Sequence, residues 1–134
     1  MRTRVLLVAM AALLLVPASV WAHHAFAAEF DATKPVKVRG TVAKLELINP
    51  HAWIHIDVKS ADGKVTRWAI EAAAPNAMLR RGFNQDSLKV GTEILVEGFQ
   101  AKDGANRANG SNITYADGKK LFIGSNGTGA PVEQ

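Results

Sequence analysis

Hydrophobic and polar residues alternate along most of the chain between Pro35 and Ile123, and this alternation predicts an all-β domain. The clearest segment is AWIHIDVK at 52–59, in which every second residue from Ala52 to Val58 is aliphatic. Such a period of two is typical of a strand with one face buried in a core. Further strands are expected over 64–71, 92–98, 111–115 and 119–123, with a Gly- and Asn-rich loop over 102–110.

The apolar face changes parity within the first strand. Aliphatic residues occupy even positions from Val36 to Val42 and then odd positions up to Leu47. One strand keeps both sets inward only if a bulge near Gly40–Ala43 adds a residue and bends the chain. A bent strand of this kind is typical of one shared between two sides of a small barrel.

The order of the expected elements indicates the architecture. Three strands, a short helix at 75–81 and then further strands predict an OB-like, five- to six-stranded, partly open barrel. Pro75 suits the start of that helix, and Gly82 suits the position after its end. A β-sandwich is the alternative, disfavoured because seven strands are hard to fit into this length. Four aromatic residues are expected to lie mostly in the core: Trp68, Phe83, Phe99 and Phe122.

Residues 1–22 have the pattern of a cleaved signal peptide. Two arginines precede the apolar run VLLVAMAALLLV, and small residues lie before the expected cleavage site. That run spans about 18 Å as a helix, short of the ~30 Å hydrocarbon core, so no membrane span is expected after cleavage. The mature protein would begin at His23 and be periplasmic or secreted. Cleavage after Ala27 is the alternative.

Cleavage leaves an N-terminal arm at 23–34, the barrel domain at 35–123 and a Gly-rich tail at 124–134 that is expected to be disordered. The formal charge of +4 includes the two arginines of the signal peptide. Without these two arginines the chain is close to neutral, which argues against nucleic acid as a partner. The absence of cysteine excludes disulfides, thiolate metal sites and a cysteine nucleophile. The sequence does not indicate an oligomeric state.

The sequence predicts no catalytic residues and therefore a non-enzymatic protein. No serine lies in a G-x-S-x-G nucleophile elbow. The carboxylates are scattered, and nearly all of them suit the solvent-facing side of their strands. They are Glu29, Asp31, Glu46, Asp57 and Glu71.

The four histidines suggest a metal site. The amine and imidazole of an N-terminal His23 can chelate Cu(II) in a plane, and a second imidazole can add a third nitrogen. His51 is the best third ligand, because the Asn49-Pro50 turn leaves it at the end of a strand. His55 lies some 13 Å further along the same strand, too far to share the ion. The predicted metal ligands are therefore His23, His24 and His51, with copper as the candidate cofactor and a small organic ligand as the alternative occupant.

The polar face of the second strand is a second candidate surface. Asn49, Trp53, His55 and Asp57 are expected to contact a ligand or a partner there. The competing function is a protein-interaction module that docks a periplasmic protein through Trp53 and His55. Simple half-buried packing of these side chains is the structural alternative.

Several motifs occur together in the mature chain. They are His-His-Ala-Phe at 23–26, Val-Arg-Gly-Thr-Val at 38–42 and Asn-Pro-His at 49–51. In this combination the chain resembles a family of small exported bacterial proteins of unknown function. The resemblance implies an exported single domain and contact between the arm and the Asn-Pro-His corner, without indicating a substrate. Phe26 and Phe30 are the expected apolar anchors of that arm.

Overall fold

Alternating positions of each strand contribute to a common core in the computed structural model, which describes residues 26–125. The predictions for the signal peptide, for His23 and His24 and for residues 126–134 lie outside the described residues. Residues 26–29 are helical and lead directly into the first strand. The elements that follow are β1 (Phe30–Glu46), β2 (Trp53–Lys59), β3 (Val65–Glu71), α3 (Pro75–Arg80), β4 (Glu93–Ala101), β5 (Arg107–Tyr115) and β6 (Lys120–Phe122).

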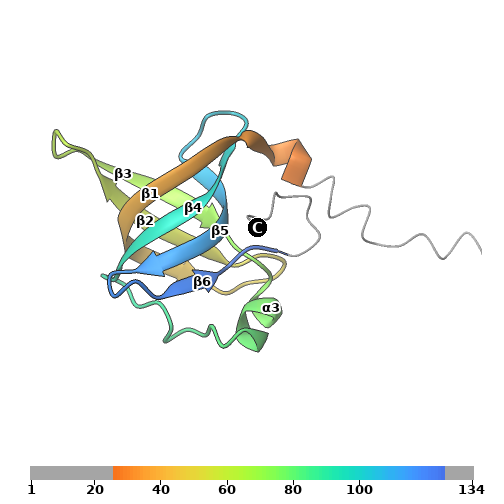
Figure 1. The fold of residues 1–134 in the computed structure, drawn as a ribbon. Helices are drawn as coiled ribbons and strands as arrows, with labels where there is room; N and C mark the ends of the chain where they lie inside the picture. The colour runs from red at the N-terminus through yellow and green to blue at the C-terminus, as the bar shows by residue number, and fades with distance from the viewer. Residues whose placement is uncertain (1–25, 126–134) are drawn as a thin grey trace, which may run out of the picture.

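Five of the strands form a ring, as Figure 1 shows. The sheet order is β3-β2-β1-β4-β5-β6, and a further parallel pairing of β3 with β5 closes the ring. The other neighbouring strands are antiparallel. The fold is therefore all-β and OB-like, with α3 between the third and fourth strands, which confirms the predicted fold class.

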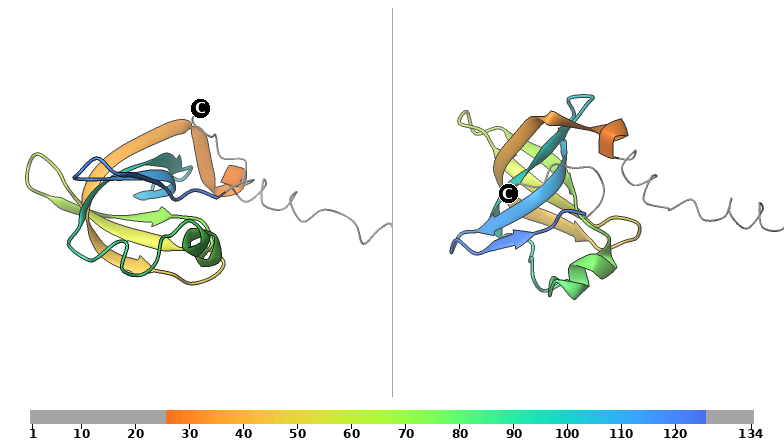
Figure 2. Two further views of the ribbon diagram at one scale, coloured as in Figure 1. Left: turned by 60° about the horizontal axis from the view of Figure 1, so that its bottom comes forward. Right: turned by 45° about the vertical axis from the view of Figure 1, so that its right-hand side comes forward.

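β1 serves both sides of the ring because it bends (Figure 2). Its residues up to Thr41 pair with β4, and Thr41–Glu46 pair with β2. The register with β2 shifts between Val42 and Lys44, which is the bulge that the change of parity predicts. The bulge returns Val42 and Leu45 to the same core, although they lie three positions apart.

Buried aliphatic side chains from β1 to β5 fill the ring, Leu121 of β6 packs against them, and α3 closes one end of the core. Met78 of α3 is fully buried, and so is Phe83, which follows the helix. Trp68, which was expected in the core, is only partly buried against it. Phe99 and Phe122 are also partly buried, and the guanidinium of Arg81 lies 4.7 Å from the ring of Phe122. Among residues 26–125, no helix reaches the length and hydrophobicity needed to cross a bilayer.

Several boundaries differ from the sequence prediction, and β4, for example, continues to Ala101 rather than ending at Gly98. β1 begins at Phe30 rather than Pro35, because Phe30 pairs with Ala101 at the end of β4. β5 begins at Arg107, so the last four residues of the expected 102–110 loop belong to a strand. Gly124, assigned by sequence to the tail, is buried, and its carbonyl accepts a hydrogen bond from Arg81 at 2.7 Å.

Gly98 has no room for a side chain, and we expect Gly98→Ala to destabilise the fold. A Cβ there would overlap the main-chain oxygen of Asn109 and lie 3.0 Å from its carbonyl carbon. Relieving this overlap requires movement of β4 against β5, at a cost of about 3 kcal/mol. Gly118→Ala is the control, because nothing lies within 4 Å of its Cβ and only its φ of +86° is unfavourable, at about 1 kcal/mol. Denaturant unfolding that ranks the two variants equally would contradict this account.

Candidate binding cavity

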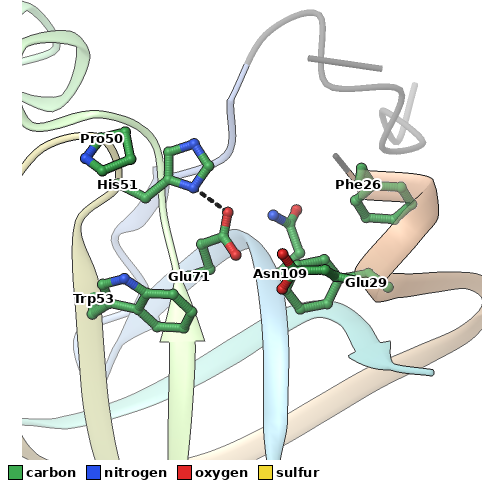
Figure 3. Close-up of a pocket in the computed structure, with 8 residues that line it drawn as sticks. Phe26, Glu29, Pro50, His51, Trp53, Glu71 and Asn109 are labelled. Carbon is green, nitrogen blue, oxygen red and sulfur yellow. Dashed lines mark ion pairs between the residues drawn. The ribbon is translucent and has the colours of Figure 1, made fainter. Parts of the chain in front are cut away.

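A cavity of about 250 Å³ lies on the outer face of the ring, between the 26–29 helical turn and the Asn-Pro-His corner (Figure 3). Its floor is a row of three side chains from neighbouring strands. Trp53 of β2 pairs with Glu71 of β3, and Glu71 pairs with Asn109 of β5. The complete lining consists of Phe26, Glu29, Phe30, Pro50, His51, Trp53, Glu71 and Asn109.

Strand alternation explains why this row faces outward. The residues that flank it, such as Ile54, Ile70 and Ala108, are fully buried in the core. Their neighbours along each strand must therefore point to the other face of the sheet. An outward row would normally meet solvent, and here the arm covers it.

The predicted aromatic anchors hold the arm over this row. Phe26 and Phe30 are 5% and 2% exposed, and their rings stack with centroids 5.8 Å apart. Phe99 of β4 meets Phe26 edge-to-face at 5.9 Å, and Ala101 completes this small apolar cluster. The prediction that Phe26 and Phe30 bury themselves is confirmed. Both rings line the cavity, and Figure 3 shows Phe26 across it from His51.

His51 and Glu71 form an ion pair at the centre of the cavity. Nδ1 of His51 contacts Oε1 of Glu71, as the dashed line in Figure 3 marks. Nε2 lies on the side of the ring away from Glu71 and has no hydrogen-bond partner among residues 26–125. The carboxylate therefore sets the orientation of the imidazole and leaves one ring nitrogen available to a ligand.

Glu71 is unusual for a charged residue because only 7% of it is exposed. Burial raises the pKa of its carboxyl group, since a buried carboxylate loses hydration. The charge and hydrogen bond of His51 oppose this increase, and the more distant Glu29 adds to it. Glu71 is therefore an exception among the carboxylates expected on the solvent-facing side of their strands, since it lies on the outer face and is buried.

Asn109 supplies a second buried polar group to the floor. It is 5% exposed, and its carboxamide points into the cavity in Figure 3. A carboxamide can donate two hydrogen bonds and accept two. A ligand or water in the cavity can therefore bind to it directly.

Of the other predicted site residues that the structure describes, Trp53 lines the cavity, whereas Asn49, His55 and Asp57 do not. His55 lies 2.7 Å from Glu46, which also accepts a hydrogen bond from Lys44. Asp57 receives two hydrogen bonds from Arg67, at 2.8 and 2.9 Å, and these hold the pKa of Asp57 below its usual value. Asn49 is exposed and precedes Pro50 through a cis peptide bond.

The sequence pattern does not predict that Glu71, Glu29 and Asn109 belong to one site. The available signal was parity, because Glu71 follows the inward residue Ile70 and so shares the face of Trp53 and His51. Parity alone does not reveal that another segment covers the face. Within residues 26–125, no three His, Cys, Asp or Glu side chains are grouped to hold a metal ion.

A family model described as a family of unknown function, DUF6152, matches residues 11–111. Searches of curated proteins and of solved structures return no match. The family match agrees with the resemblance to an uncharacterised family, while export and metal binding stay predictions.

We expect Glu71→Gln to gain stability relative to its parent chain as the pH rises. Burial raises the pKa of Glu71 above its ordinary value of 4.5, so the folded state retains this proton at a higher pH than the unfolded state. The stabilisation that comes from the protonated Glu71 carboxyl group is complete below its pKa in the unfolded state. It is lost as the pH rises through its pKa in the folded state. Gln does not titrate and has no such loss. The free energy of unfolding, measured from acid to neutral pH, reports the difference.

Two choices make this measurement specific. A His51→Asn background in both chains removes the charge and the hydrogen bond that oppose the effect of burial on Glu71. Glu97→Gln is the control of opposite sign, because hydrogen bonds from Lys120 and Lys37 lower the pKa of Glu97. The stabilisation from the ionised Glu97 carboxylate is present above pH 4.5 and is lost as the pH falls. Glu97→Gln should therefore lower the free energy of unfolding at neutral pH by up to about 1 kcal/mol. If the free energy of unfolding of Glu71→Gln differed from that of its parent by the same amount at every pH, the burial argument would be contradicted.

Proposed function

Because the chain belongs to the DUF6152 family, whose function is unknown, we propose a role from its own site: it is an exported, non-enzymatic protein that captures Cu(II) at the rim of the cavity. The proposed ligands are the imidazole of His51 and the amine and imidazole of His23, with His24 as a supporting group. The observation that carries the proposal is the pairing of His51 with buried Glu71.

A carboxylate behind a histidine is the usual device for orienting a metal-binding imidazole. Glu71 occupies Nδ1 of His51 and leaves Nε2, the nitrogen such a ligand would use. The buried carboxylate also makes the imidazole a stronger donor, because it stabilises positive charge on the ring. Glu71 therefore suits a supporting role behind His51 rather than the role of a direct ligand.

The length of chain available supports a contribution from the amino terminus. Phe26 lines the cavity and follows His23 by three residues, which span at most about 11 Å when extended. An amine and imidazole from one residue plus a second imidazole form a planar nitrogen set that Cu(II) prefers. Since no metal group exists among the described residues alone, this proposal depends on cleavage before His23.

The competing role as an interaction module has less support. His55 and Asp57 already pair with Glu46 and Arg67, so two polar groups of that face are engaged within the sheet. Trp53 lines the cavity and is half-buried, which suits contact with a small occupant. A small organic ligand would use the same cavity, and metal titration distinguishes it from Cu(II).

We expect the mature protein, purified from its exporting host, to bind one Cu(II) per chain. His51→Ala should weaken binding about a hundredfold, because it removes a proposed ligand, and Glu71→Gln about tenfold, because it removes only the supporting carboxylate. Native mass spectrometry reports the amino terminus and the bound metal, and competition titration reports the affinity.

The control is His55→Ala, which removes an imidazole from the same strand face without touching the cavity. It should bind copper as the wild type does. One Ala inserted before His23 tests the amino terminus, and it should weaken binding as strongly as loss of His51. Equal affinities for the wild type, the inserted variant and His51→Ala would refute the proposed site.

A further inference from the structure

The floor of the cavity offers hydrogen-bond acceptors to a donor group. Trp53, Glu71 and Asn109 lie side by side on three neighbouring strands, and such strands are about 4.8 Å apart in a sheet. Oε1 of Glu71 contacts His51, and the second oxygen of Glu71 lies on the side of Asn109 in Figure 3. The carboxamide of Asn109 also points into the cavity. A donor bound between these two side chains would therefore meet a carboxylate oxygen and an amide oxygen.

The lining contains carboxylates but no strongly basic side chain. Glu29 and Glu71 both line the cavity, and none of the described lining residues is Lys or Arg. Glu29 pairs with Arg107, which lies outside the lining. Glu71, of which only 7% is exposed, pairs with the imidazole of His51, a weaker base than Lys or Arg. A ligand that carries its own ammonium group would bring a second positive charge to Glu71 and offset part of the cost of burying this carboxylate.

Aromatic rings border this polar floor. Trp53 and Phe26 lie on opposite sides of it in Figure 3, and Phe30 and Pro50 complete the apolar lining. The faces of such rings attract cations, and contact with them buries the hydrocarbon part of an amine. The cavity volume of about 250 Å³ is below the roughly 300–1,000 Å³ of sites for drug-sized ligands, so the occupant must be small.

We propose that the interior of this cavity binds a small primary amine as its ammonium ion. The ammonium donates to Glu71 and Asn109, and the hydrocarbon part packs against Trp53. A primary ammonium has three N–H donors for these acceptors, whereas a quaternary ammonium has none. The inference goes beyond the copper proposal and does not depend on it, because this site uses only residues within 26–125, whereas copper would bind Nε2 of His51 at the rim.

The test is a titration of metal-free protein with butylammonium chloride, since bound copper would repel this probe. The indole N–H signals in heteronuclear NMR spectra report the site, because Trp53 lines the cavity whereas Trp68 packs against the core. We expect a saturable shift of the Trp53 signal and no shift of the Trp68 signal. Butanol, butyrate and tetramethylammonium should each bind at least about tenfold more weakly, because they lack the charge, reverse it or lack the N–H donors.

Two carboxylate variants test the role of Glu71. Glu71→Gln keeps the shape of the side chain and removes its charge, and it should weaken butylammonium binding about tenfold. Glu46→Gln is the matched control, because Glu46 also pairs with a histidine, His55, but lies outside the cavity. It should bind the probe as the wild type does. Unchanged affinity in Glu71→Gln would overturn the placement of the ammonium at this carboxylate.

The comparison of probes uses the wild type and so does not depend on the folding of a variant. Equal affinities for butylammonium and butanol would overturn the inference, because the cavity would then recognise only the hydrocarbon part. Equal affinities for butylammonium and tetramethylammonium would overturn the assignment to a primary amine. A Trp53 signal that does not respond to butylammonium would overturn the ammonium site and leave the copper proposal standing, whereas failure of the wild type to bind copper would leave the ammonium site standing.

Discussion

The parallel pairing of β3 with β5 is the contact on which the rest of the site depends. It closes the ring, and it places Glu71 beside Asn109 on one outward face. Gly110, which follows Asn109, leaves room for the side chains of Ile70 and Ile123, since a Cβ there would lie 2.7 Å from a methyl carbon of each. Closing the ring therefore assembles the cavity floor as well as the core.

The arm then converts this outward row into a buried one. Phe26 and Phe30 line the same cavity as Glu71, and burial raises the pKa of the Glu71 carboxyl group. His51 offsets part of that penalty through its charge and hydrogen bond. The burial of Glu71 and the orientation of His51 are thus physically linked, because a hydrated Glu71 would hold the imidazole less firmly.

Local patterns in the sequence predict most of the fold and little of the site. The period of two identifies the strands, and the change of parity near Ala43 identifies the bulge that lets β1 serve two sides. The start of β5 escapes prediction because Arg-Ala-Asn-Gly at 107–110 has weak strand propensity and is held by its neighbours on β3 and β4. The burial of Glu71 cannot be predicted from the local sequence for a similar reason, since it depends on a segment some forty residues away.

The charges around the cavity favour a cationic occupant over an anionic one. Glu29 and Glu71 both line it, whereas the nearby Arg107 is already paired with Glu29 and Asp103. Counted together, the carboxyl groups of Glu29, Glu71 and Asp103 outnumber the one guanidinium, so an anion would gain little there. The volume of about 250 Å³ exceeds that of one water molecule, about 30 Å³, several-fold. A metal ion held at the rim by His51 would therefore leave room for bound water, which the carboxamide of Asn109 can hydrogen-bond from the floor.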